Sequence, residues 1–134
     1  MIVVDSSVLI DFWAGDASCK AAADALMTED SDWISVGLWR YEVGHVLTKY
    51  VRTGRISEAR ARAALLESDG LLIETVEEMD LSEVWDISRS TGLTYYDSSF
   101  VWLAQARGLR LRTRDEKILL KCPHVAAAMP KVVR

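Results

Sequence analysis

Short apolar segments alternate with longer amphipathic segments along this chain, and that alternation constrains the fold more than any other feature. Apolar runs predict strands at residues 2–4, 33–36, 71–76 and 110–113, with a further short strand at 131–133. Helical periodicity fills the intervals, over about 17–27, 38–52, 81–90, 98–107 and 116–121, with further helices after Ser6 and Ser57. Short apolar strands separated by helices pair in parallel and carry helices on both faces. The sequence therefore predicts an α/β fold.

The size and composition of the chain indicate one globular domain over residues 1–134. This length suffices for one core and is too short for two comfortable ones. Half of the residues are hydrophobic and 27% are charged, which excludes a disordered chain. The N-terminus lacks a basic leader and no apolar run approaches membrane-spanning length, so we expect a cytoplasmic protein without a membrane partner. Cys19 and Cys122 lack CxxC spacing, which is typical of reduced thiols.

Four acidic residues occupy positions where an acid is unexpected, and three of them are aspartates. Asp5 ends the first apolar run, Asp97 opens a nearly all-apolar helix, and Asp115 follows the strand at 110–113. Each has an ordinary structural role available, because aspartate is a preferred residue at the start of a helix. Asp5 and Asp115 are also expected at the same edge of the sheet, where the carboxyl ends of parallel strands meet and ligands bind.

The fourth acid, Glu42, separates a structural from a functional interpretation. It falls inside the apolar arc of the helix at 38–52, between Leu38 and Val46. We expect it in the middle of that helix, where it cannot cap an end. A carboxylate among apolar side chains is unfavourable unless it is paired or bound to metal. A buried salt bridge with an arginine is the structural alternative, and a functional site is the interpretation that we favour.

If the fold gathers Asp5, Glu42, Asp97 and Asp115, their like charges repel unless a cation or protons neutralise them. Carboxylates from separate segments suit Mg²⁺ or Mn²⁺, which prefer oxygen ligands and retain several waters. Such an ion activates water and stabilises charge on a phosphoryl group. The sequence contains no phosphate-binding loop, dinucleotide turn, HExxH or GxSxG motif. His45 lies at the edge of the Glu42 face, and we interpret it as a packing or substrate-facing residue.

The net charge of −4 argues against binding nucleic acid through a global field, but the acidic site itself contributes to that charge. Basic residues gather in two regions, and two explanations stay open for them: a solvated helix surface, which is the commoner one, and a phosphate-binding track. The first region holds Arg40, Lys49, Arg52 and Arg55, and the second spans 107–114 and 117–121.

Four segments together resemble the motifs of the PIN-domain nucleases, in the order in which that family has them. They are VDSSVLI at 4–10, LWRYEVGHVL at 38–47, YDSSFVWLA at 96–104 and LRTRDEK at 111–117. The matches span nearly the whole chain, and its compact length is similar to that of VapC-type toxins. One such motif is a weak signal, whereas four in order are a strong one.

The resemblance implies a three-layer α/β/α PIN-like fold with a central parallel sheet of about five short strands. It also implies a Mg²⁺- or Mn²⁺-dependent endoribonuclease that cleaves phosphodiester bonds with metal-activated water. The implied metal ligands are Asp5, Asp97 and Asp115, with Glu42 completing the acid set and Ser6 and Thr113 supporting the pocket through hydrogen bonds. His45 stands where many members have Asn, and Glu116 is an additional acid beside Asp115.

The implied partners are an RNA substrate, a second copy of the chain in a homodimer, and a cognate antitoxin that silences the enzyme. Two other interpretations stay open from the sequence. One is a PIN-fold RNA-processing nuclease without an antitoxin. The other is a non-catalytic acidic module, such as a receiver-like phosphoacceptor domain, in which Glu42 has no role.

Overall fold

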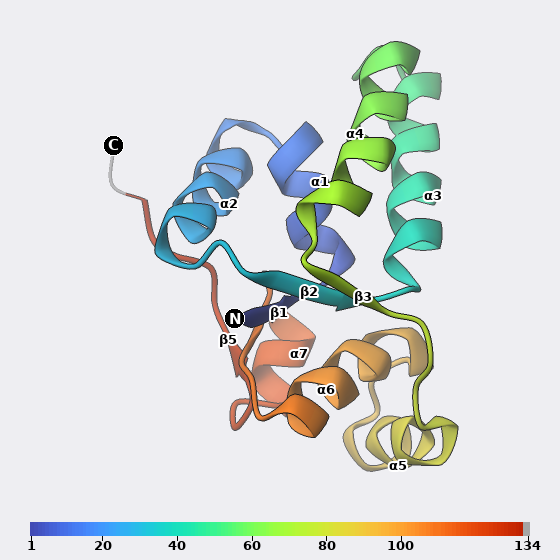
Figure 1. Ribbon diagram of the computed structural model, residues 1–134, viewed down its shortest axis with the longest axis vertical. Coiled ribbons are helices and arrows are strands. Elements are labelled where there is room, and N and C mark those ends of the chain that lie inside the picture. The colour runs from blue at the N-terminus through green and yellow to red at the C-terminus, as the bar shows by residue number, and fades with distance from the viewer. Residues whose placement is uncertain (133–134) are drawn as a thin grey trace.

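A computed structural model describes residues 1–132 of the chain, and in that range five strands alternate with seven helices (Figure 1). The strands are β1 (Ile2–Val4), β2 (Trp33–Val36), β3 (Glu74–Val76), β4 (Leu111–Arg112) and β5 (Ala126–Ala127). The helices are α1 (Ser6–Ala14), α2 (Ala17–Glu29), α3 (Trp39–Arg52), α4 (Glu58–Leu71), α5 (Leu81–Thr91), α6 (Tyr95–Arg107) and α7 (Glu116–Lys121). None of the helices in this range is both long enough and apolar enough to cross a membrane.

The five strands form one parallel sheet in the order β3-β2-β1-β4-β5. The predicted α/β fold with about five parallel strands is therefore confirmed. The predicted strand at 71–76 begins later, because Leu71 still belongs to α4. The strand predicted at 131–133 is wrong: residues 131 and 132 join no strand, and Val133 lies outside the described residues. The fifth strand is Ala126–Ala127. Alanine has a low strand propensity, and this segment forms a strand because it pairs with the open edge of β4.

The side chains of the central strands alternate between two hydrophobic cores. In β1, Ile2 and Val4 belong to the core shared with α1 to α4, whereas Val3 belongs to the core shared with α6 and α7. In β2, Trp33 and Ile34 divide in the same way. Figure 1 shows the result, with α1 to α4 on one face of the sheet and α5 to α7 on the other. The three layers follow from the two-residue period of buried strands.

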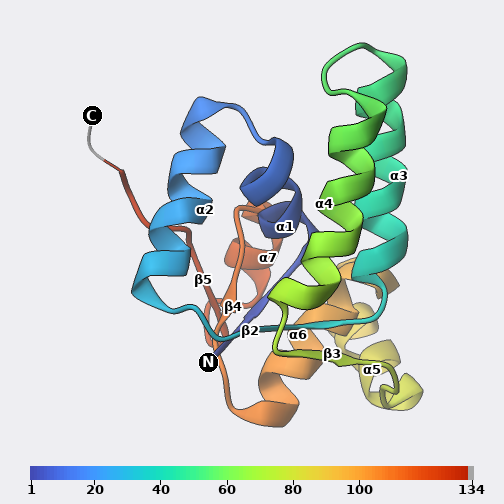
Figure 2. The ribbon, with the colours of Figure 1, turned by 45° about the horizontal axis from the view of Figure 1, so that its top comes forward.

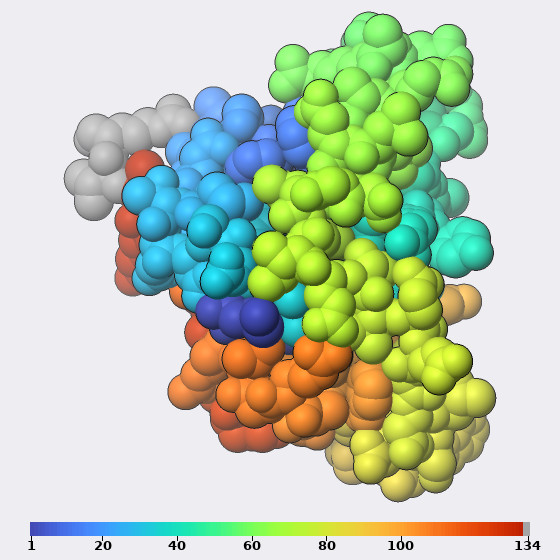
Figure 3. Space-filling model, in the orientation of Figure 1, coloured from blue at the N-terminus to red at the C-terminus, as the bar shows by residue number. Residues whose placement is uncertain are grey.

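Helices α3 and α4 form an antiparallel hairpin that projects beyond the sheet (Figure 2). Gly54, with a φ of 75°, allows the turn between them, and Ser57 caps α4 by accepting a hydrogen bond from the backbone N–H of Arg60. In the space-filling view the tip of the hairpin, in green, stands above the rest of the molecule (Figure 3).

Candidate active site

The register of β1 and β4 brings Asp5 next to Thr113 at the carboxyl edge of the sheet. Val4 pairs with Arg112, so the residues that follow on the two strands lie side by side. The Thr113 hydroxyl donates a short hydrogen bond to Asp5 Oδ2, and both residues are buried. The parallel pairing therefore fixes one oxygen of the first acid.

The other oxygen of Asp5 caps α1. Oδ1 accepts hydrogen bonds from the Ser7 hydroxyl at 2.6 Å and from the backbone N–H of Val8 at 3.3 Å. Asp5 is only 5% exposed, and no Lys or Arg of the described residues lies at ion-pair distance from it. Capping alone does not explain a buried carboxylate without a cationic partner. Burial raises the pKa of Asp5, the hydrogen bonds from Ser7, Thr113 and Val8 oppose that rise, and the charge of Asp97 adds to it.

Asp115 lies two residues beyond Thr113 and caps α7. Its Oδ1 accepts hydrogen bonds from the backbone N–H groups of Lys117 and Ile118 at 2.9 and 3.1 Å. Its own N–H donates to Thr113 Oγ1 at 3.0 Å. Thr113 thus links two of the four acids, while Asp115 Oδ2 accepts no hydrogen bond from the described part of the chain.

Glu42 lies in the first turn of α3 and not in the middle of the helix, because α3 begins at Trp39. It caps nothing; instead its Oε1 accepts a hydrogen bond of 2.7 Å from the hydroxyl of Ser6, at the start of α1. The buried arginine salt bridge is wrong as an explanation, since no cationic side chain within residues 1–132 pairs with Glu42. Burial raises the pKa of Glu42, the Ser6 bond opposes this, and the charges of Asp97 and Asp5 reinforce it.

Asp97 is the third residue of α6, because the helix begins at Tyr95 and not at Ser98 as predicted. Thr94 is the cap: its hydroxyl accepts a hydrogen bond of 3.0 Å from the Asp97 N–H. A capping role for Asp97 is therefore wrong. The sequence did carry the signal, since Thr followed by an acid three residues later is a common helix start. Burial raises the pKa of Asp97, and the charge of Asp115 adds to that rise. The hydrogen bond with Thr94 and the positive charge of Lys117 lower it in part.

The four carboxylates act on one another electrostatically. The charge of Asp97 raises the pKa of both Asp5 and Glu42, and the charge of Asp115 raises that of Asp97. Each of the four predicted acids thus lies within electrostatic range of at least one other. Their role as metal ligands stays a prediction.

The chemistry of this group fits a hard divalent cation. All donors are carboxylate oxygens, and they lack cationic partners among the described side chains. Over residues 1–132 no group of three or more His, Cys, Asp or Glu side chains is arranged so that it could hold a metal ion. Mg²⁺ retains several waters and commonly binds through one or two carboxylates, so a smaller set of these acids suits it. The residues therefore fit the ion by charge and donor type.

A largely apolar pocket of about 470 Å³ opens beside Glu42. Tyr41 from α3 and Tyr96 from α6 line it and are exposed, and His45 lines it as well. Exposed aromatic rings next to the acids offer surfaces on which nucleic-acid bases stack. His45 accordingly lies in a position suited to a substrate-facing role, while Glu116 is exposed in the first turn of α7.

Sequence reasoning missed an ion pair that supports the site. Asp11, in α1, is only 3% exposed, and its Oδ2 accepts a hydrogen bond of 2.6 Å from Arg114 Nε. Arg114 stands between Thr113 and Asp115, so the pair holds the connection from β4 to α7 against α1. The partners are separated by 103 positions, and no local pattern relates them. The hydrogen bond from Ser7 to Asp5, in contrast, follows a recognisable local signal, a hydroxyl two residues after a helix-capping acid.

Known proteins resemble this chain in sequence and in structure. The model of the PIN domain family matches residues 2–122. Exonuclease VapC9 from Pyrobaculum aerophilum is 36% identical over 81 residues, which are 60% of this chain and 60% of that relative, less than two thirds of its length. Ribonuclease VapC1 from Mycobacterium tuberculosis is 30% identical over 118 residues, covering 87% and 86% of the two chains.

A solved structure agrees as well. PAE2754 from Pyrobaculum aerophilum superposes with a TM-score of 0.75 at 29% identity and covers 93% of this chain and 81% of that one. These matches confirm the resemblance predicted from the four motifs and the three-layer architecture that it implied.

Proposed function

The chain belongs to the PIN domain family, and we propose that it is a metal-dependent endoribonuclease, the toxin component of a type II toxin–antitoxin pair. One observation supports the proposal: acids from separate elements raise one another's pKa and have no ion-pair partner in the described chain. Relatives named as an exonuclease and a ribonuclease support nuclease chemistry. The reaction is hydrolysis of a phosphodiester bond in RNA.

The acidic side chains have different roles in this reaction. Mg²⁺ or Mn²⁺ held by Asp5, Asp97 and Asp115 would lower the pKa of the attacking water and offset charge on the phosphodiester. Asp5 keeps one orientation because hydrogen bonds from α1 and Thr113 engage both of its oxygens. Glu42 Oε2 accepts no hydrogen bond from the described residues, and with its raised pKa this carboxylate would be placed to accept a proton from the attacking water.

Replacing single acids tests the site. Asp5→Asn and Asp97→Asn should each abolish Mn²⁺-dependent cleavage of RNA while circular dichroism shows an unchanged fold. Asp24→Asn is the matched control, because Asp24 is exposed on α2 and pairs only with Lys20. Cleavage retained by both site variants rejects the site.

The proposal includes three partners and a location. RNA is the substrate, a second copy of the chain completes a homodimer, and a cognate antitoxin silences the enzyme in the cytoplasm. Expression of the chain alone should arrest growth, and co-expression of the short neighbouring gene should relieve the arrest and yield a complex that co-purifies. Harmless overexpression of a gene that stands alone supports an RNA-processing nuclease instead.

Cleavage within the strand distinguishes this proposal from exonuclease activity, the activity in the name of VapC9. A circular RNA has no ends, so only an endonuclease linearises it. We expect the wild-type chain to linearise such a substrate with Mn²⁺ and the Asp97→Asn variant to leave it intact.

A further inference from the structure

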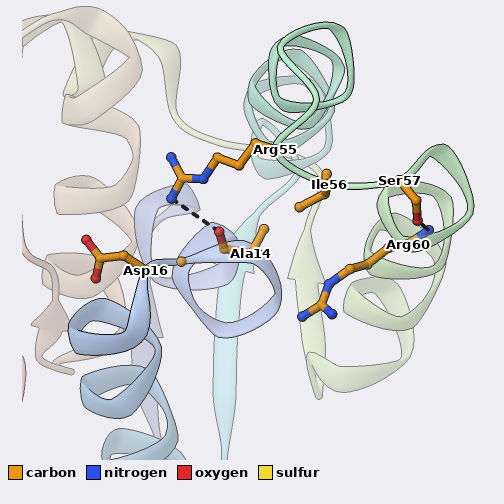
Figure 4. A pocket seen from close by; sticks show the side chains of 7 residues that line it. Ala14, Asp16, Arg55, Ile56, Ser57 and Arg60 are labelled. Carbon is orange, nitrogen blue, oxygen red and sulfur yellow. Dashed lines mark hydrogen bonds between the residues drawn. The ribbon is translucent and has the colours of Figure 1, made fainter.

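A second pocket, of about 730 Å³, lies at the end of α1 opposite to Asp5. Its walls come from the connection between α1 and α2, the turn between α3 and α4, and the first turn of α4 (Figure 4). Two arginines, Arg55 and Arg60, line it together with Asp16. Neither arginine belongs to the acidic site.

The two guanidinium groups approach the end of α1 from opposite sides, as Figure 4 shows around Ala14. Arg60 Nη2 donates a hydrogen bond of 3.0 Å to the carbonyl of Trp13, and Arg55 Nη2 donates one of 3.5 Å to the carbonyl of Ala14. Arg55 also lies over the ring of Tyr50, 4.1 Å from its centroid. Each arginine donates one hydrogen bond to a backbone carbonyl. Since a guanidinium has five N–H donors, most of the donors stay available for a ligand.

Charge balance distinguishes these arginines from several others in the described chain. Arg40, Arg107 and Arg112 form ion pairs with carboxylates, whereas neither Arg55 nor Arg60 has a carboxylate within ion-pair distance among residues 1–132. The hydrogen bond of 2.8 Å from the backbone N–H of Cys19 lowers the pKa of Asp16, and the charge of Arg55 adds to that effect, so Asp16 offsets part of the Arg55 charge without forming an ion pair. Capping α1 requires one donor from each arginine and leaves both guanidinium groups without an ion-pair partner among residues 1–132.

We propose that this pocket binds backbone phosphates of the RNA strand whose scissile bond lies at the acidic site, an inference that rests on the proposed function. Helix α1 extends from the acidic site to the arginine pocket. It starts beside Asp5 and ends at Ala14, nine residues and roughly 14 Å away at 1.5 Å per residue. An RNA strand that leaves the acidic site toward this end of the molecule would bring phosphates a few nucleotides from the cleaved bond to Arg55 and Arg60. Guanidinium groups suit this task because their forked N–H donors match phosphate oxygens.

Salt dependence of RNA binding tests the pocket without relying on cleavage. Binding of a single-stranded RNA is measured in the Asp97→Asn background, with and without the double change Arg55→Gln and Arg60→Gln. Each phosphate contact adds about 0.7 to the slope of log affinity against log salt, so two lost contacts reduce its magnitude by about 1.4. Arg62→Gln is the matched control, since Arg62 is an exposed neighbour on α4 that pairs with Glu58. It removes one positive charge near the pocket arginines and should leave the slope unchanged.

Two further measurements separate phosphate binding from damage to the fold. The variant Arg55→Lys with Arg60→Lys retains both charges and should keep the slope; a slope lost in this variant as well overturns the proposal. A dinucleotide has one phosphodiester, which the acidic site occupies, so its affinity should not respond to the double glutamine change. An equal slope in the glutamine variant and its parent also overturns the proposal and assigns the pocket to another ligand, such as an acidic protein segment. Neither outcome affects the test of the acids themselves.

Discussion

Thr113 and Asp5 are separated by 108 positions in the sequence and share a hydrogen bond at the edge of the sheet. The same Thr113 oxygen accepts the N–H of Asp115, so one hydroxyl orients two acids. Thr113→Val keeps the side-chain shape and removes both interactions. We expect the affinity for Mn²⁺ and the value of kcat/KM to fall about 10- to 100-fold, the usual effect of losing a partner that orients metal ligands.

Isothermal titration with Mn²⁺ and cleavage of a labelled RNA measure the two quantities. Thr113→Ser retains the hydroxyl and should stay within roughly threefold of the wild type, because the donor to Asp5 is preserved. Wild-type metal affinity in the valine variant contradicts the role given to Thr113.

We expect repulsion among the acids to lower the free energy of unfolding of the metal-free protein at neutral pH. Burial and the charge of Asp115 raise the pKa of Asp97 above its ordinary value of 3.8. The resulting penalty is absent below the unfolded-state pKa, grows as the pH rises, and is complete above the folded-state pKa. Asp97→Asn should therefore raise the free energy of unfolding at pH 7 by about 0.5–2 kcal/mol without metal.

Chemical denaturation in EDTA at pH 7 and at successively lower pH checks this sign. The gain from Asp97→Asn should shrink as the pH falls and vanish below the ordinary aspartate value, where the wild-type side chain is protonated in both states. Added Mg²⁺ should stabilise the wild type by mass action and the variant less. A variant less stable than the wild type at pH 7 in EDTA contradicts the model of repelling charges.

The sequence was sufficient to predict four of the five strands and to single out the four acids as candidates, because both leave local patterns. Strands buried on two faces appear as apolar runs, and an acid that ends such a run, as Asp5 does, is conspicuous. Helix starts were less well predicted: α6 begins at Tyr95 because Thr94 caps it, and apolar periodicity alone does not reveal a polar first turn. The strand Ala126–Ala127 exists through pairing with β4, which no local pattern encodes.

The partner of each hydroxyl that orients the acids depends on the packing of α1 and could not be predicted in detail. Ser6 and Ser7 are adjacent, yet Ser6 donates to Glu42 and Ser7 to Asp5, because successive helix residues point in different directions. The pair between Asp11 and Arg114 likewise requires α1 and the connection after β4 to lie side by side.

That ion pair carries a prediction of its own. Arg114→Ala leaves the Asp11 carboxylate, 3% exposed, without a cation. Since Arg114 is itself half exposed, solvent screens part of the interaction, and we expect the free energy of unfolding to fall by about 1–3 kcal/mol at pH 7. Burial already raises the pKa of Asp11, so the loss should diminish at lower pH, where the carboxyl binds a proton.

Denaturation of the single variants and of the double variant Asp11→Leu with Arg114→Met measures the coupling between the two residues. The double variant should recover much of the lost stability, because replacing both partners leaves no unpaired buried charge. Arg62→Ala, which breaks the exposed pair with Glu58, should change stability by less than about 0.5 kcal/mol. Equal effects of Arg62→Ala and Arg114→Ala are incompatible with a structural role for the buried pair.

Gly15 and Gly70 should respond in opposite ways to replacement by alanine, because only Gly15 is closely packed. A Cβ on Gly15, which follows α1, would lie 2.7 Å from the Asp11 carbonyl oxygen and 2.8 Å from the Asp11 Cα, both backbone atoms that cannot move aside. Gly15→Ala should therefore destabilise the protein by about 1–3 kcal/mol and widen the turn that borders the arginine pocket. Gly70 in α4 has nothing within 4 Å of an added Cβ, so Gly70→Ala should stabilise the protein by about 0.5–1 kcal/mol through the lower entropy of the unfolded chain. Thermal and urea denaturation of both variants checks the opposite signs, and a neutral Gly15→Ala would show that the end of α1 relaxes away from α2.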